Sequence, residues 1–356
     1  MDTVYFMIDG KLIEKFKSYE IDHDMFKGCG TFRAELAKPM SISPLAEVEV
    51  YINDTLELTG ILDARNPKDD KDSSSRTISG RDLMGVLADA HVDEAVTIKD
   101  QTLKQLADRL IGKLDKVKRA AIYYSEEAKT RLNSKGPSVG QFDSALPHMQ
   151  TEMGSSVFET LAQYARIKGL LFYSLPHGTG STQYQPVFVF SKARESGQAA
   201  FSLTRRKDGK GNNINTSELV QDDSKRYSQV TVMGQKQGVD GEASGAWNIL
   251  ATKTDSTFPF YKPFVLKDDS GGDSPKQQAR LILEKMRHDA FRLTYGVTGH
   301  SQNGKNWTIN ELCTVRDDED DYNLYDDYLI YGRKFSMNKE QGQNTELRLG
   351  YKGMAA

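Results

Sequence analysis

The sequence has few cysteines, no excess of charge and no long apolar run. Only two cysteines occur among 356 residues, Cys29 and Cys313, without CxxC spacing, which argues against a disulfide scaffold and a cysteine zinc site. With 47 Lys+Arg against 50 Asp+Glu, the net charge of −3 argues against a nucleic-acid coat or a polybasic membrane binder. No apolar run approaches the ~18 residues of a spanning helix, and the start lacks the basic region of a signal peptide. We expect no membrane insertion.

Catalytic motifs are also missing. The sequence contains no GxxxxGK[ST] loop, no GxGxxG, no GxSxG elbow and no HExxH among its six histidines. A carboxylate pair for glycoside hydrolysis is always available in a chain with this many acids, but nothing local favours one pair. We therefore predict a protein that is not an enzyme and that needs no cofactor and no metal.

The pattern of apolar residues predicts a β region, then a mixed α/β region, then β again. Near the start, Asp9-Gly10 joins the apolar runs 4–8 and 11–14, as in a hairpin. Asn53-Asp54 separates the alternating runs 48–52 and 56–62 in the same way. Further strands are expected at 76–79, 170–175, 187–190 and 227–233, and at five positions after residue 293.

Three helices are predicted by capping boxes, in which an N-cap hydroxyl is followed three residues later by Glu or Gln. Each box precedes an apolar stripe with spacings of three and four residues. The three pairs are Thr102 and Gln105, Ser156 and Glu159, and Ser274 and Gln277.

An acidic run is the sharpest charge feature of the chain. It consists of Asp317, Asp318, Glu319, Asp320 and Asp321, continued by Asp326 and Asp327. Clustered carboxylates suit hard cations, but the glycine and terminal Glu of an EF-hand loop are absent, so calcium is the weaker interpretation. A solvated connection between strands, or a negative wall that faces a partner, is favoured.

Several motifs, taken in order, resemble the baseplate hub proteins of Mu-like contractile-tail phages, also called tail or late-control D-type proteins. The first is the strand–GR–helix segment 78–87, with Gly80 and Arg81. Segments 103–114, 154–161 and 226–235 follow, the last ending in Gly234 and Gln235. Next come a helix at 277–292, the pair Gly299-His300 and the segment around Trp307. The set covers nearly the whole chain.

The resemblance implies an α+β, mostly β fold, with two homologous antiparallel β-barrel tube domains and an intervening α/β domain. The expected boundaries are 1–90 for the first barrel, 91–225 and 240–291 for the middle domain, and 226–239 with 292–356 for a discontinuous second barrel. A weak internal echo between Gly80-Arg81 and Gly234-Gln235 would then mark the duplicated barrels.

For function, the resemblance implies a homotrimer that forms a pseudo-sixfold ring. Its partners would be the central spike protein, the tail tube protein and other baseplate proteins, and DNA would pass through without specific binding. The expected place is the tail baseplate of a virion assembled in the bacterial host cytoplasm. The acidic run is expected near an inter-chain or lumen-facing surface. Alternatives are the hub of a tailocin or type VI-like injection spike and a baseplate-associated peptidoglycan hydrolase.

Overall fold

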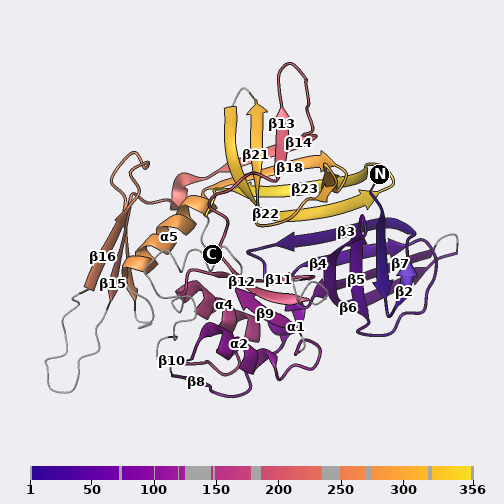
Figure 1. The fold of residues 1–356 in the computed structure, drawn as a ribbon, viewed down its shortest axis with the longest axis horizontal. Helices are drawn as coiled ribbons and strands as arrows, with labels where there is room; N and C mark the ends of the chain where they lie inside the picture. Colours follow the sequence, from indigo (N-terminus) through magenta and orange to yellow (C-terminus); the bar gives the residue numbers. More distant parts are fainter. Residues whose placement is uncertain are drawn as a thin grey trace.

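The fold of this chain is mostly β, with 49% of the described residues in strands and 15% in helices. The structure, a computed structural model, describes residues 2–71, 74–99, 101–118, 120–124, 146, 149–177, 186–234, 249–268, 275–319 and 323–353. Figure 1 shows three parts: a large sheet formed by both ends of the chain, a helical part beside it, and a small sheet with one helix.

The large sheet has 13 strands, paired in the order β14-β18-β23-β22-β3-β4-β7-β6-β5-β1-β2, with β21 on β22 and β13 on β21. Its N-terminal strands are β1 Val4–Ile8, β2 Lys11–Ile13, β3 Phe16–Asp24, β4 Thr31–Leu36, β5 Glu47–Ile52, β6 Thr55–Asp69 and β7 Ser74–Asp82. Its later strands are β13 Phe201–Arg205, β14 Thr216–Gln221, β18 Phe291–Thr298, β21 Glu311–Asp318, β22 Asn323–Asn338 and β23 Gly342–Gly350. β3 and β22 pair antiparallel and join the two halves into one sheet.

Two predicted hairpins of this sheet are confirmed. β1 pairs antiparallel with β2, and Asp9 and Gly10 have φ angles of 49° and 72°. β5 pairs with β6, and Asn53 and Asp54 have φ angles of 49° and 59°. Two consecutive positive φ angles define the type I′ turn that suits the twist of a hairpin, and Asn, Asp and Gly adopt them at least cost.

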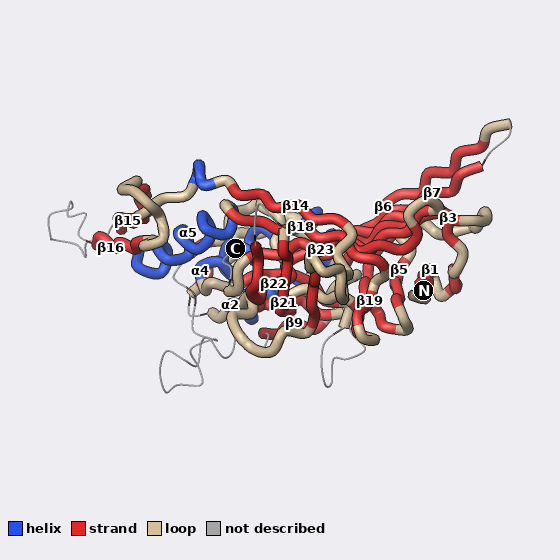
Figure 2. Tube along the Cα trace, turned by 90° about the horizontal axis from the view of Figure 1, so that it is seen from above, coloured by secondary structure: helices blue, strands red, loops and turns tan. Residues whose placement is uncertain are grey.

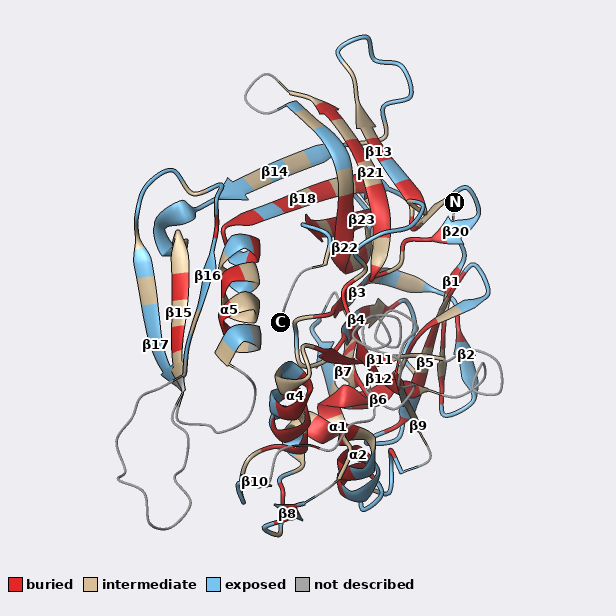
Figure 3. Cartoon of the chain, turned by 60° about the vertical axis from the view of Figure 1, so that its left-hand side comes forward, coloured by how far each residue is buried: buried red, intermediate tan, exposed pale blue. Residues whose placement is uncertain are grey.

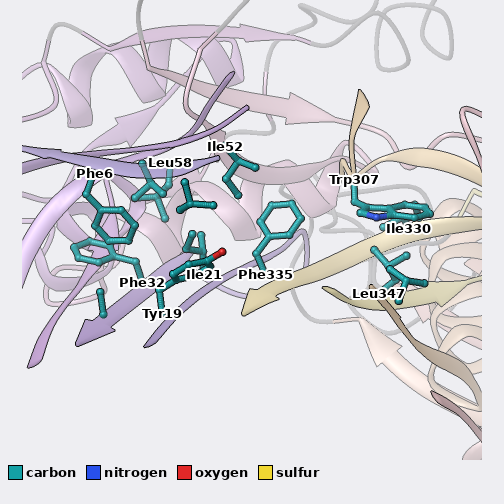
Figure 4. Packing of buried hydrophobic residues seen from close by; sticks show 14 of the residues in the cluster. Phe6, Tyr19, Ile21, Phe32, Ile52, Leu58, Trp307, Ile330, Phe335 and Leu347 are labelled. Atoms are coloured by element: carbon teal, nitrogen blue, oxygen red, sulfur yellow. The ribbon is translucent and has the colours of Figure 1, made fainter. Parts of the chain in front are cut away.

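The two halves share one hydrophobic core. Phe6 and Phe32 come from the N-terminal strands, whereas Trp307 and Leu347 come from the C-terminal part, and all belong to the same buried cluster. Figure 4 shows Phe335 of β22 between the two groups. Every second side chain of a strand points into this cluster, and a slip of one residue would turn those side chains outward. The shared cluster therefore fixes the strand register in both halves. β6 and β7 continue beyond this core as a projecting two-stranded arm (Figure 2).

The middle part of the chain forms a mixed unit. Its helices are α1 Met84–Asp89, α2 Leu103–Ile111 and α4 Val157–Ile167, and its strands are β8 Thr97–Ile98, β9 Ala121–Tyr124, β10 Met149–Gln150, β11 Leu171–Leu175 and β12 Val187–Ser191. The capping boxes of Thr102 with Gln105 and of Ser156 with Glu159 are confirmed. Ser274, the N-cap of the third predicted box, lies outside the described residues.

A separate small unit, here called the α5 unit, combines β15 Gln229–Gly234, β16 Ile249–Thr254, β17 Pro263–Asp268 and α5 Pro275–Asp289. β15 lies in the centre, antiparallel to β16 and parallel to β17. Figure 3 shows α5 packed on one face of this sheet. Val230 and Val232 of β15 are buried against Ala279 and Leu283 of α5. Shorter elements are the 3-10 helix Asp223–Lys225 and the hairpin of β19 Ser301–Gln302 with β20 Lys305–Asn306.

The strand pairing corrects the expected composition of the second β domain. Segment 226–239 was expected to open it, but within the described ranges β15 pairs with β16 and β17 and with no strand of the large sheet. Among the described residues, the early strands of this half are instead β13, which pairs with β21, and β14, which pairs with β18. β15 alternates clearly because α5 covers one of its faces, whereas β14 is an exposed strand with little apolar signal.

Candidate functional site

Gly80, the first residue of the expected signature, lies in the middle of the large sheet. It pairs with Phe32 of β4 and with Leu62 of β6. A Cβ atom at this position would overlap the carbonyl oxygen of Ile61 and the ring of Phe32. Glycine is therefore required by the close approach of neighbouring strands.

Arg81, the next residue, ties the sheet to the first helix. Its guanidinium donates to both carboxylate oxygens of Asp63, at 2.7 and 3.2 Å, and to both of Asp89, at 2.9 and 2.6 Å. Such two-pronged pairs fix orientation as well as charge. The strand–GR–helix motif thus has a structural role, since Asp63 belongs to β6 and Asp89 to α1.

Asp82 was not singled out from the sequence, although it directly follows the motif. Its buried carboxylate accepts hydrogen bonds from the backbone N–H of Gly30 at 2.8 Å, the N–H of Met84 at 3.0 Å and the hydroxyl of Ser174 at 2.6 Å. Burial raises the pKa of Asp82 to about 6, although these hydrogen bonds lower it. One carboxylate thereby connects the large sheet, α1 and β11.

Trp307, the signature residue of the last motif, is buried in the core that the two halves of the sheet share. Its ring packs on Phe201 with centroids 4.6 Å apart, and its carbonyl oxygen accepts a hydrogen bond from Arg333 of β22. Arg333 also donates to Glu57 of β6 at 2.5 Å, and Asn306 donates to the other oxygen of Glu57 at 2.6 Å. The two halves are therefore joined by a buried ion pair as well as by apolar packing.

A second charged group lies where β3 and β22 pair. Arg348 of β23 contacts Asp22, and its Nε lies 3.1 Å from the carboxylate of Asp24. The nearby His300 is buried between Tyr19 and Thr345, at 2.8 and 3.0 Å. The pair Gly299-His300 belongs to the ordered motifs of the sequence, whereas sequence reasoning missed Asp22, Asp24 and Arg348. The sequence signal for such residues is a charged side chain on the buried face of a strand. Arg333 is an example, because it stands two residues before the buried Phe335 and so lies on the same face of β22.

Gly234 and Gln235 do not occupy a position equivalent to Gly80 and Arg81. Gly234 ends β15 in the α5 unit, where it pairs with Ile249 and Asp268, and Gln235 lies outside the described residues. The two segments belong to different sheets. The echo between them therefore does not mark a duplicated β domain.

The acidic run is divided between the interior and the surface. Asp317 is fully buried, and its carboxylate accepts from Arg205 at 2.7 and 2.9 Å and from the Tyr295 hydroxyl at 3.0 Å. Asp317 thus cannot present its charge to a lumen, contrary to expectation, because the parallel pairing of β13 with β21 places Arg205 beside it. Asp320 and Asp321 lie outside the described residues.

The surface acids of this region also have cationic partners. Arg205 reaches Glu319 at 3.0 Å, Arg316 lies 3.4 Å from Asp318, and Lys352 lies 3.3 Å from Asp326. Within the part of the chain that the structure describes, no three His, Cys, Asp or Glu side chains are grouped as metal ligands require. None of the described helices combines the length and the apolar character needed to cross a membrane.

Comparisons with known proteins agree with this architecture. Residues 3–82 match the N-terminal domain model of the Mu phage baseplate assembly protein GpP-like family, and residues 226–281 match the third-domain model of tail protein NMB1110-like proteins. The first match ends at the last residue of β7. The second covers all of β15, β16 and β17, consistent with a separate α5 unit.

The similarity extends over nearly the whole chain. The baseplate hub protein gp44 of Escherichia phage Mu is 25% identical over 98% of this chain and 87% of its own length. A tail protein from Neisseria meningitidis MC58 has a TM-score of 0.81 at 23% identity, covering 99% of this chain and 97% of its own. A prophage MuSo2 tail protein from Shewanella oneidensis has a TM-score of 0.77 at 21% identity, with full coverage of both chains.

The fold is accordingly that of phage tail proteins. The resemblance to the baseplate hub proteins of Mu-like phages, which the ordered motifs predict, is confirmed.

Proposed function

We propose that this chain is the structural hub of a Mu-like contractile tail baseplate and that it works as a homotrimer. The observation that carries the proposal is the similarity to the Mu hub protein along 98% of the chain. Three copies of a two-part sheet would form a pseudo-sixfold ring, which can match a threefold spike to a sixfold tail tube.

The buried contacts between the two halves support such a role. A ring segment that joins spike to tube must not bend between its two β parts. The shared core and the buried pair of Glu57 and Arg333 hold these parts together. Interiors packed in this way deform little and transmit force.

In this proposal the partners are the central spike protein, the tail tube protein and other baseplate proteins. DNA passes through the ring without specific binding. The protein is assembled in the bacterial host cytoplasm and ends in the virion tail. Among the acids of the described run, Asp318 and Glu319 remain candidates for an inter-chain or lumen-facing surface. If so, Asp318→Asn with Glu319→Gln should change the salt dependence of assembly.

The proposal assigns no catalytic role to the chain. The described side chains of the signature are engaged in ion pairs or close packing, as Arg81 and Trp307 show. Release of peptidoglycan fragments by the purified protein would support the hydrolase alternative instead. A hub of a tailocin or type VI-like spike would share the fold, and genes for capsid and tail tube beside this one would separate the two cases.

The mass of the purified protein tests the trimer. Light scattering coupled to gel filtration should give the mass of three chains of 39.9 kDa each. A monomer at every concentration, also after mixing with the spike protein of the same particle, would contradict it. Electron microscopy of particles that lack this chain should show tail tubes and spikes that are not joined. Intact tails without the chain would overturn the hub role itself.

A further inference from the structure

A cavity of about 370 Å³ lies where three separate segments of the chain meet. The loop after β3 supplies Phe26 and Lys27, α4 and β11 supply its middle wall, and α5 supplies Lys285. Because α5 belongs to the small unit, anything bound in this cavity would contact the α5 unit, the middle unit and the large sheet's loop together.

The walls of the cavity are apolar and aromatic. Phe158 and Ala162 of α4 and Phe172 of β11 line it together with Phe26. Phe158 and Phe26 are only half-buried, so their rings are available to a ligand. Partly open aromatic walls of this kind favour an aromatic or large aliphatic group.

The charge of the lining is of one sign. Its three charged residues are Lys27, Arg166 and Lys285, and no carboxylate lines the cavity. Lys27 is paired with Asp22 at 2.8 Å. Within the described ranges, no acidic side chain forms an ion pair with Arg166 or Lys285, and both are exposed.

Two acids that are chain neighbours of lining residues are already engaged. The carboxylate of Asp24 accepts the N–H of Phe26 at 2.9 Å and lies 3.1 Å from Arg348. On α5, Glu284 pairs with Arg280 at 2.8 Å. Among the described residues neither cation forms an ion pair, although Asp289 lies one helical turn from Lys285. An incoming carboxylate would therefore find donors without displacing an existing ion pair.

The cavity is also built on a fixed support. The ring of Phe26 stacks on the buried His288 of α5, with centroids 5.0 Å apart, and His288 contacts Tyr331 at 5.4 Å. This stack holds α5 against the loop after β3, so the helix that carries Lys285 is positioned beside the aromatic wall before a ligand arrives. A site prepared in this way loses little conformational freedom on binding.

We propose that this cavity is an anchor site for an acidic segment of a partner polypeptide that carries an aromatic side chain. The aromatic ring would enter between Phe26 and Phe158, and flanking carboxylates would pair with Arg166 and Lys285. A nucleic acid would need an extended basic track, whereas two free cations beside one hollow suit a short acidic peptide. Aromatic residues that fill pockets, together with arginines, are frequent interface hot spots.

The test uses the full-length protein and a fluorescein-labelled pentapeptide with phenylalanine at its centre and two acidic residues on each side. Fluorescence anisotropy should show saturable binding that weakens with added salt. Arg166→Glu with Lys285→Glu should weaken it about ten-fold or more, since two attractive charge contacts become repulsive. The matched control is Arg33→Glu with Lys38→Glu, an exposed pair outside the lining, which should leave binding unchanged.

Two further probes separate the alternatives. A peptide with alanine at its centre should bind much more weakly, and one with lysines in place of the acids should not bind. The proposal is overturned if the alanine peptide binds equally, if the reversal at Arg166 and Lys285 has no effect, or if a thymidine oligonucleotide of equal charge binds as well. None of these results depends on assembly of a baseplate, so failure here leaves the hub role to its own test.

Discussion

The large sheet and the α5 unit each contain a buried carboxylate paired with arginine, but the surroundings differ. In the large sheet, Glu57 and Arg333 are 7% and 3% exposed and join two halves of one extensive core. In the α5 unit, Asp255 is paired with Arg226 at 2.8 Å and has Arg287 at 3.7 Å as a second cation, while the core of this unit has four buried residues among those described. The two halves of the sheet share one core, whereas the α5 unit has a small core of its own, so we expect that the α5 unit can be weakened separately.

The largest effect is expected for Arg333→Met. The change leaves the carboxylate of Glu57 buried with only Asn306 as a partner, and removing one member of a buried pair costs about 3–5 kcal/mol. Chemical unfolding followed by circular dichroism should show the loss. Adding Glu57→Gln should recover a large part of it. A single variant as stable as the parent would show that the pair does not hold the halves together.

Leu283→Ala should break the α5 unit while sparing the sheet. Leu283 is 5% exposed and packs against the valines of β15, and such truncations cost about 2–5 kcal/mol. Hydrogen exchange should speed up in 229–234 and 275–289 only. The same truncation at Leu347, in the core of the sheet, serves as the matched control and should affect both halves of the sheet. If both variants speed up hydrogen exchange equally in the α5 unit and in the large sheet, the two parts are not separate in stability.

Lowering the pH should loosen α5 through His288. Burial lowers the pKa of His288 to about 4, and Asp289 raises it only in part. When α5 is detached, His288 regains its ordinary pKa of 6.5 and binds a proton more readily than in the docked form. The docking of α5 is therefore fully stable above pH 6.5 and loses stability as the pH falls toward 4. Between pH 7 and 5 the loss is about 2 kcal/mol.

Hydrogen exchange of α5, corrected for the intrinsic effect of pH, measures this loss. The variant His288→Phe keeps a planar ring against Phe26 and Tyr331 but cannot be protonated. Its α5 should remain protected at pH 5. The idea fails if the variant and the parent lose protection to the same extent.

The smallest effect is expected for Arg226→Met in the α5 unit. Asp255 would retain Arg287 and the N–H and hydroxyl of Thr257, at 3.0 and 2.6 Å. Because the carboxylate stays partnered, the cost should be about 1.5 kcal/mol, the lower end for a hydrogen bond to a charged group. Thermal unfolding of Arg226→Met and of Arg333→Met, measured side by side, gives the difference between the two stability losses. A loss as large as that of Arg333→Met would remove the distinction between the two ion pairs.

Local signals in the sequence predicted local structure well. Asp9-Gly10 and Asn53-Asp54 predicted turns because Asp, Asn and Gly adopt the positive φ angles of a type I′ turn more readily than other residues. The N-caps Thr102 and Ser156 predicted helix starts for the same reason. The placement of 226–239 was wrong because alternation shows that a strand has a buried face but not which strand lies beside it.

In the candidate site, too, residues within local motifs were predicted from the sequence, whereas residues with distant partners were not. Gly80 and Arg81 were found because an ordered set of motifs resembles a family, and their contacts explain why those residue types are needed. The buried residues Glu57 and Asp82 were missed, since Glu57 finds Arg333, and Asp82 finds Gly30 and Ser174, far away along the chain.

The sequence by itself determined the mostly β character, the turns, the helix starts and the likeness to phage tail hubs, since these depend on residues close together along the chain. Only the tertiary structure decided that β3 pairs with β22, that Asp317 turns inward to Arg205, and that Phe26, Arg166 and Lys285 surround one cavity. These facts depend on contacts between distant segments, which are fixed when the apolar faces of all the elements are buried together.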